Sequence, residues 1–218
     1  MYIRLREAAA RIYTSQNYKT RGEVGEITLH AICRDYFDTI PIAPRVFYLT
    51  SSNEVVKSFD MVHVRYTGKS EFELWLGEAK FYTNSGEAIA SAIHSIGTHI
   101  GQGFLNNEKL ILGPQISKHI PRYQEIRDIF SVQTSLDELF KSAVFPICIL
   151  CDSQAVLKAK VQSDKYVVDI TKDLDTLESQ IIRTCLASKI RIMLIYLPLA
   201  SKALLAASFD ARLKGLQL

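Results

Sequence analysis

Apolar residues recur along this chain with two different periods, one typical of helices and the other of strands. Helical spacing predicts helices over residues 4–13, 21–37, 87–104, 173–187 and 201–216, and two short helices within 119–142. Strand-like runs predict strands over 46–50, 58–66, 72–82, 144–151 and 190–197, with an edge strand over 165–170. Helices interspersed with strands in this order predict an α/β fold, in which helices flank a mixed central sheet.

The predicted strands differ in how they should be covered. The runs 58–66 and 72–82 flank the turn-forming sequence Thr67-Gly68-Lys69-Ser70, so we expect them to pair as a hairpin. The runs 144–151 and 190–197 are almost continuously apolar, which is typical of strands that are buried on both faces.

The length of 218 residues fits a single domain. We expect residues 1–218 to form one unit, with its core motifs in 21–82. The strands and helices of 144–218 should complete the sheet and its helical layers.

Composition narrows the class of protein. Hydrophobic residues make up 48% of the chain and charged residues 22%, a balance that builds a core and excludes a disordered chain. The net charge of +3 permits a nucleic-acid partner without requiring one. Cys148 and Cys151 form a CxxC pair inside an apolar run, so we interpret them as buried strand cysteines rather than zinc ligands.

Nothing in the sequence directs the chain to a membrane. The N-terminus lacks the apolar segment of a signal peptide, and no window approaches the roughly 18 apolar residues of a membrane span. The cysteines do not require disulfides, so a cytoplasmic location is expected. GxSxG, P-loop and dinucleotide-binding motifs are absent from the sequence, so we expect no ATP or NAD chemistry in this chain.

The clearest chemical signal lies in the two strands of the predicted hairpin. Glu78 and Lys80 alternate with Ala79, so both should point to one face of an otherwise apolar strand. A buried Glu and Lys are costly unless they have a function. Asp60 opens the preceding strand, and pairing of the two strands can bring its carboxylate within a few ångströms of Glu78.

Such a pair of carboxylates predicts a metal site. Two carboxylates at close range favour a divalent cation between them, and oxygen ligands favour Mg²⁺ or Mn²⁺ over zinc. In phosphodiester hydrolysis the metal held by Asp60 and Glu78 would polarise the phosphate and acidify a bound water. Lys80 would orient that water or stabilise charge on the phosphate.

The predicted helix 21–37 offers two more acids. Glu23 and Glu26 lie at i and i+3 near its start, and the adjacent glycines allow close approach of a strand or a phosphate backbone. We favour Glu26 as the acid that faces the site, because it lies deeper in the helix, and keep Glu23 as the alternative. Both acids can instead simply complement the positive end of the helix.

Other candidate residues have a structural interpretation. His94 and His99 are five residues apart, a spacing that does not suit a metal pair on a helix, so we interpret them as surface or packing residues. Trp75 is interpreted as a core residue rather than a platform for base stacking.

The acids and the lysine also carry a family resemblance. Asp60 with Glu78-Ala79-Lys80 on consecutive strands, after a helix carrying Glu26, resembles the PD-(D/E)xK nuclease superfamily, with Phe59 in place of the usual proline. Three stretches resemble one family within it: Arg21-Gly22-Glu23-Val24-Gly25-Glu26 with Leu29-His30 and Arg34-Asp35, then Gly77-Glu78-Ala79-Lys80-Phe81-Tyr82, and Tyr196-Leu197-Pro198-Leu199 with Lys202. They resemble HamA, the nuclease subunit of Hachiman anti-phage systems.

The resemblance implies both a fold and a function. It implies a restriction-endonuclease-like core and a metal-dependent DNA nuclease. It also implies a superfamily 2 helicase partner, HamB, which restrains the nuclease until phage DNA is sensed. Two other hypotheses stay open: a housekeeping repair or restriction nuclease with the same site, and an inactive scaffold with a nuclease fold. The full set of Asp60, Glu78, Lys80 and a helical Glu favours catalysis.

Overall fold

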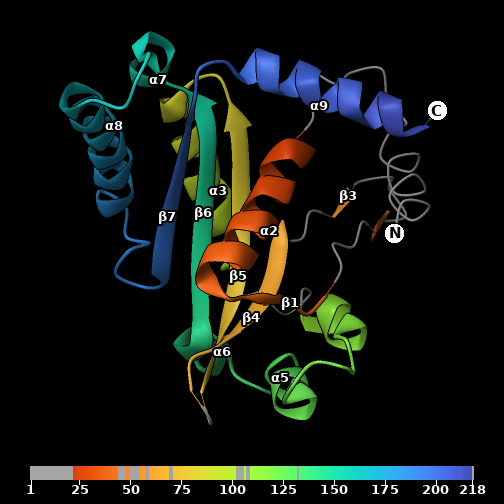
Figure 1. The fold of residues 1–218 in the computed structure, drawn as a ribbon. Helices are drawn as coiled ribbons and strands as arrows, with labels where there is room; N and C mark the ends of the chain where they lie inside the picture. Colours follow the sequence, from red (N-terminus) through yellow and green to blue (C-terminus); the bar gives the residue numbers. More distant parts are fainter. Residues whose placement is uncertain are drawn as a thin grey trace.

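The computed structural model describes residues 22–43, 48–49, 55–56, 59–68, 71–101, 106, 109–131 and 133–217. Its central feature is a five-stranded sheet in the order β1-β4-β5-β6-β7 (Figure 1). The strands are β1 (Ile40–Pro41), β4 (Met61–Tyr66), β5 (Phe72–Tyr82), β6 (Ala143–Asp152) and β7 (Arg191–Leu199). The helices are α2 (Glu23–Phe37), α3 (Ser85–His99), α5 (Tyr123–Ile129), α6 (Leu136–Ser142), α7 (Gln154–Lys158), α8 (Asp164–Ile182) and α9 (Lys202–Gln217), with a 3₁₀ turn over Gly113–Gln115.

The sheet is mixed. β4 runs antiparallel to β5, with Met61 opposite Gly77 and Tyr66 opposite Phe72. β6 is parallel to β5 on its other side, and β7 is parallel to β6. The predicted hairpin is therefore confirmed, and so is the expected α/β architecture with helices flanking a mixed sheet.

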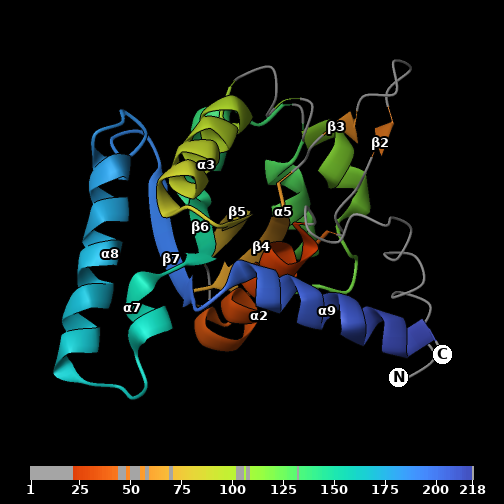
Figure 2. The same ribbon diagram turned by 90° about the horizontal axis from the view of Figure 1, so that it is seen from above.

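Helices cover both faces of the sheet (Figure 2). Leu29 of α2 and Ala206 of α9 belong to one buried cluster. Ile96 of α3 and Leu177 of α8 belong to the other, together with Leu76 of β5. Because side chains alternate along a strand, β5 contributes to both clusters in turn. Two sets of apolar contacts therefore fix this central strand from both sides.

Several predicted core residues are buried. Trp75 lies in the middle of β5 and is closed to solvent, which confirms its interpretation as a core residue. Cys148 and Cys151 are likewise buried in β6, as free thiols. Burial raises the pKa of the Cys148 thiol to about 12, so it stays protonated and inert at neutral pH.

The prediction of an edge strand over 165–170 is wrong, because this stretch is part of α8. Its β-branched and aromatic residues favour a strand. Ser163 caps the helix, however, by accepting a hydrogen bond from the backbone N–H of Tyr166. Lys165 also pairs with Asp169 one turn later. These interactions favour the helix over the intrinsic strand preference, and the predicted helix 173–187 is the continuation of α8, which ends at Ile182.

Two other strands differ from expectation. β7 is less buried than predicted, because it is the last strand of the sheet and has a neighbouring strand on one side only. The predicted strand 46–50 is reduced in the described residues to β2 (Tyr48–Leu49), which pairs with β3 (Val55–Val56) in a separate small sheet. The predicted helix 4–13 lies outside the described residues. Within those residues, every helix is too short or too polar to cross a bilayer.

Candidate active site

Asp60 lies at the point where β4 begins to pair with β5. The pairing starts with Met61 opposite Gly77, so the next position in the ladder would set Asp60 against Glu78. The carboxylate of Asp60 accepts a hydrogen bond through Oδ2 from the backbone N–H of Ala79, at 2.9 Å. The structure therefore brings Asp60 to the segment of β5 that carries Glu78 and Lys80.

Glu78 and Lys80 form an ion pair on the α3 side of β5. Lys80 Nζ donates to Glu78 Oε1 at 2.7 Å and to Ser95 Oγ at 3.0 Å. Glu78 is only 4% exposed. Its second oxygen, Oε2, is buried and accepts no hydrogen bond within the described residues. Buried polar atoms in proteins are normally satisfied, so this oxygen calls for a bound ion or another donor.

Helix α3 adds polar side chains that were not predicted to belong to the site. They form three facing pairs with alternate residues of β5: Ser91 with Tyr82, Ser95 with Lys80, and His99 with Glu78. In the last pair, His99 Nδ1 lies 3.8 Å from Glu78 Oε2. The three α3 residues repeat every four positions, which places them along one side of the helix. That repeat is the sequence signal that would have found them.

His99 also contacts the segment that precedes Asp60. Its ring meets Phe59 edge-on, with the ring centroids 4.8 Å apart. His99 is 6% exposed and Phe59 1%, so the two rings form a closed wall beside Glu78. Of the two alternatives in the interpretation of His94 and His99, packing is confirmed for His99 and a surface position for His94. The position of His99 next to Glu78 was not predicted.

Helix α2 reaches β5 from the opposite face. A Cβ atom at Gly25 would lie 3.4 Å from the Cβ of Phe81 and 3.6 Å from the Cβ of Ala79. These two residues alternate with Glu78 and Lys80 along the strand. The absence of a side chain at Gly25 therefore lets the start of α2 pack directly on the back of the strand that carries the acid and the lysine.

The two acids of α2 are not gathered with Asp60 and Glu78. In the described part of the chain, no three His, Cys, Asp or Glu side chains form a group that could hold a metal ion. Glu23 Oε2 is buried and has no hydrogen-bond partner within the described residues. The choice between Glu23 and Glu26 as a third acid of the site stays a prediction.

A chain of hydrogen bonds approaches Asp60 from α2. His30 Nε2 lies 3.1 Å from the backbone carbonyl oxygen of Asp60, and His30 Nδ1 lies 2.8 Å from His63 Nε2. His63 Nδ1 lies 2.7 Å from Thr39 Oγ1. Burial lowers the pKa of His63 to about 3 and also lowers the pKa of His30. Both rings are therefore neutral near pH 7.

The donor set suits a hard divalent cation. Asp60 and Glu78 offer carboxylate oxygens, and Mg²⁺ is commonly held by one or two carboxylates, with waters and substrate phosphates completing its shell. The buried Glu78 Oε2 provides an oxygen with free lone pairs within the described residues. The residues present therefore fit Mg²⁺ or Mn²⁺ better than zinc, which favours nitrogen and sulfur ligands.

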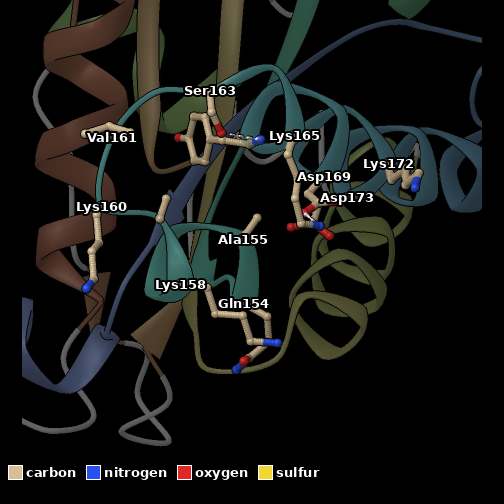
Figure 3. A pocket seen from close by; sticks show the side chains of 12 residues that line it. Gln154, Ala155, Lys158, Lys160, Val161, Ser163, Lys165, Asp169, Lys172 and Asp173 are labelled. Atoms are coloured by element: carbon tan, nitrogen blue, oxygen red, sulfur yellow. Dashed lines mark hydrogen bonds and ion pairs between the residues drawn. The ribbon is translucent and has the colours of Figure 1, made fainter.

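A separate pocket of about 480 Å³ lies between α7 and α8 (Figure 3). Its acids already have partners, because Asp169 accepts a hydrogen bond from Lys165 and Asp173 accepts one from Ser153. Lys158 on its rim is exposed. The pocket contains none of the predicted catalytic residues, so we do not assign it to the reaction.

Comparison with known proteins gives one match. The family model described as HamA matches residues 1–213 of the chain. The match confirms the resemblance to the HamA family and extends it over nearly the whole chain. Neither the curated proteins nor the solved structures contain a match.

Proposed function

The chain belongs to the HamA family of the Hachiman anti-phage defence system, and from this premise we propose that it is a metal-dependent DNA nuclease. The observation that carries the proposal is the buried oxygen Glu78 Oε2, which has no hydrogen-bond donor within the described residues. It belongs to a carboxylate that already binds Lys80 and lies next to the ladder position of Asp60. A cation bound at this oxygen would satisfy it.

Asp60 and Glu78 would hold the metal. When bound, Mg²⁺ or Mn²⁺ polarises the phosphate and lowers the pKa of a coordinated water, which supplies the nucleophile for phosphodiester hydrolysis. Asp60 is suited to this role because the N–H of Ala79 fixes its carboxylate against the segment of β5 that carries Glu78. This arrangement of acids on neighbouring strands supports assignment to the PD-(D/E)xK superfamily.

Lys80 would act on the phosphate. Its ammonium group has three hydrogens, and within the described residues Glu78 and Ser95 take two of them. The third can bind a phosphate oxygen or hold the attacking water. A positive charge fixed at this position stabilises the negative charge that develops on the phosphate in the transition state.

The surroundings strengthen these interactions. The packed rings of Phe59 and His99 form an aromatic wall beside Glu78, which keeps water away from one side of the carboxylate. Electrostatic attraction is stronger where water is excluded. The same wall ties the Asp60 segment to α3, so both acids of the site are held by one packed unit.

Membership of the family supports a proposal for the substrate and for the partner. We propose DNA as the substrate and a superfamily 2 helicase of the HamB type as the partner. The sequence contains no P-loop motif, so ATP-driven movement along DNA would belong to the helicase. In this scheme the chain supplies cleavage, and the partner supplies the signal that phage DNA is present.

Plasmid cleavage tests the proposal. Supercoiled plasmid is incubated with the full chain and Mg²⁺ or Mn²⁺, with and without EDTA, and with and without a HamB-type helicase. Glu78→Gln and Lys80→Met should each lower the rate about 100-fold or more, because each removes a group that stabilises the transition state. Glu87→Gln, which alters an exposed acid of α3, should cleave as the wild type does.

Two results would contradict this function. Cleavage that survives in both site variants would mean a contaminating nuclease or a different active site. Absence of cleavage by the wild type, even with metal and helicase present, would favour an inactive scaffold that retains the nuclease fold.

A further inference from the structure

Thr39, His63 and His30 form a hydrogen-bonded chain that ends on the backbone of Asp60. They come from different parts of the fold: Thr39 follows α2, His63 lies in β4, and His30 lies in α2. Thr39 is 2% exposed and His63 is fully buried. All four ring nitrogens of the two histidines have a partner, as buried polar atoms require.

The position of each proton in this chain can be deduced from its end. A backbone carbonyl only accepts hydrogen bonds, so His30 Nε2 must carry the hydrogen that is donated to Asp60. In a neutral ring His30 Nδ1 then accepts, and His63 Nε2 must donate to it. His63 Nδ1 is left as an acceptor, so the hydroxyl of Thr39 donates to it. The chain therefore runs in one direction, from Thr39 to Asp60.

The hydrogen-bonded chain ends at the backbone carbonyl of Asp60, which the β4–β5 ladder does not fix. The β4–β5 ladder starts at Met61 opposite Gly77, so Asp60 lies just beyond it. Its carboxylate is fixed by the N–H of Ala79, and its carbonyl is fixed by His30. Two independent anchors, one from β5 and one from α2, thus set the orientation of this residue.

We propose that His30 and His63 are positioning residues, which hold the backbone of Asp60 so that its carboxylate faces the metal. This role rests on the proposed nuclease function. Packing alone does not explain the two rings, because Leu29 and Met61 already join α2 to the sheet through apolar contacts. Buried hydrogen bonds also fix the orientation of the groups that they join, because they constrain angles as well as distances.

The ring protonation states test the chain directly. Long-range ¹H–¹⁵N spectra of the full protein distinguish a protonated ring nitrogen from a bare one, and His30→Gln and His63→Gln assign the signals. Both rings should carry their hydrogen on Nε2 near pH 7.5. A hydrogen on Nδ1 of either ring would exchange donor and acceptor in one of these hydrogen bonds and overturn the inference.

Metal affinity tests the positioning role without relying on catalysis. Isothermal titration with Mn²⁺ should give a Kd about tenfold or more weaker for His30→Leu than for the wild type, because groups that orient metal ligands typically contribute that much. His30→Gln should recover most of the affinity, since its amide can donate to the carbonyl of Asp60. His94→Leu, at an exposed position of α3, should bind as the wild type does.

The outcomes separate this inference from the proposed function. A folded His30→Leu variant with the wild-type Kd would overturn the positioning role and leave the nuclease intact. If His30→Leu does not fold, Thr39→Val is used in its place. Loss of the hydroxyl donor at the start of the hydrogen-bonded chain should weaken Mn²⁺ binding and produce a mixture of the Nδ1–H and Nε2–H tautomers of His63. Unchanged Mn²⁺ binding would again overturn the positioning role. Absence of Mn²⁺ binding by the wild type would overturn both proposals, while the ring spectrum would still report on the chain.

Discussion

Lys80 and Glu78 lie two residues apart on β5, and their side chains form an ion pair of 2.7 Å that is almost closed to solvent. The side chains are 14% and 6% exposed, so water screens the attraction only weakly. One oxygen of Glu78 takes part, and the other accepts no hydrogen bond within the described residues. In the described part of the chain, Lys80 is therefore the one side chain that donates a hydrogen bond to Glu78, and the stability of the buried carboxylate depends on it.

Replacement of Lys80 by Met should lower the free energy of unfolding by about 3–5 kcal/mol, because it leaves the buried Glu78 carboxylate without its charged partner. Addition of Glu78→Gln should recover most of this loss, since the amide carries no charge. Urea denaturation of the wild type, both single variants and the double variant completes the cycle. If Lys80→Met costs no more than Lys172→Met at an exposed site, the pair is not buried in solution.

Mn²⁺ should stabilise the folded protein, because the ion binds the assembled carboxylates and not the unfolded chain. At a concentration of 100 times the Kd, the free energy of unfolding should rise by about 2.7 kcal/mol. Asp60→Asn and Glu78→Gln should abolish this gain, and the exposed control Glu87→Gln should keep it. Urea denaturation with and without metal measures the difference; an equal gain in Glu78→Gln would locate the ion elsewhere.

Ser95→Ala should slow cleavage about tenfold with little change in KM, because Ser95 orients Lys80, the group proposed to stabilise charge on the phosphate in the transition state. A hydrogen bond to a charged group contributes roughly 1.5–3 kcal/mol, and about 1.4 kcal/mol corresponds to a tenfold change in rate. Ser91→Ala is the matched control, since Ser91 bonds to Tyr82 instead. Equal rates for the two variants would show that the Ser95 contact with Lys80 does not matter for catalysis.

The sequence predicted the strands near the site well, because their signal is local. Alternation along 72–82 and the turn before it defined β5 and its pairing with β4. The β-branched residues of 165–170 predict a strand, whereas the capping serine just before them starts a helix in the structure. The preference of a residue for strands reflects side-chain packing more than an intrinsic preference of the backbone. It can therefore be overridden when a helix cap and an ion pair favour a helix.

The sequence predicted the site only in part, because the helical residues of the site depend on which helix covers which face of the sheet. Glu78 and Lys80 could be assigned to one face from alternation alone. The identity of the covering helix follows from the fold: α3 lies over these two residues, and α2 lies behind them. The spacing of His99 to His94 does not indicate the site, whereas its spacing of four residues to Ser95 places both side chains along the side of α3 that faces Glu78 and Lys80.

Gly77→Ala should destabilise the protein by about 1–3 kcal/mol through overpacking. A Cβ atom at Gly77 would lie 2.9 Å from Leu29 Cδ2 and 3.2 Å from Met61 Cβ, and the latter atom cannot move without the backbone. Gly97→Ala is the control, because a Cβ atom there meets nothing within 4 Å and alanine favours the helix by about 1 kcal/mol. Thermal or urea unfolding of both variants measures the changes. A neutral Gly77→Ala would mean that α2 is not packed this closely on β5.

The buried ring of His63 should make the fold less stable in mild acid. Its pKa is lowered to about 3 in the folded protein, against an unfolded value of about 6.5. Between these values the unfolded chain binds a proton that the folded protein does not. The contribution is therefore complete above about pH 6.5 and is lost progressively as the pH falls toward 3. At pH 5 the loss from this ring alone is about 2 kcal/mol relative to pH 8.

Urea denaturation of the wild type and His63→Gln at these two pH values isolates this effect, because the other titrating groups are common to both proteins. The wild type should lose about 2 kcal/mol more than His63→Gln between pH 8 and pH 5. His94→Gln, at an exposed position, should behave as the wild type does. Equal losses in the wild type and His63→Gln would mean that the folded protein accepts a proton on His63. A charged His63 has no lone pair to accept a hydrogen bond from Thr39, so the direction deduced for the chain to Asp60 would fail with it.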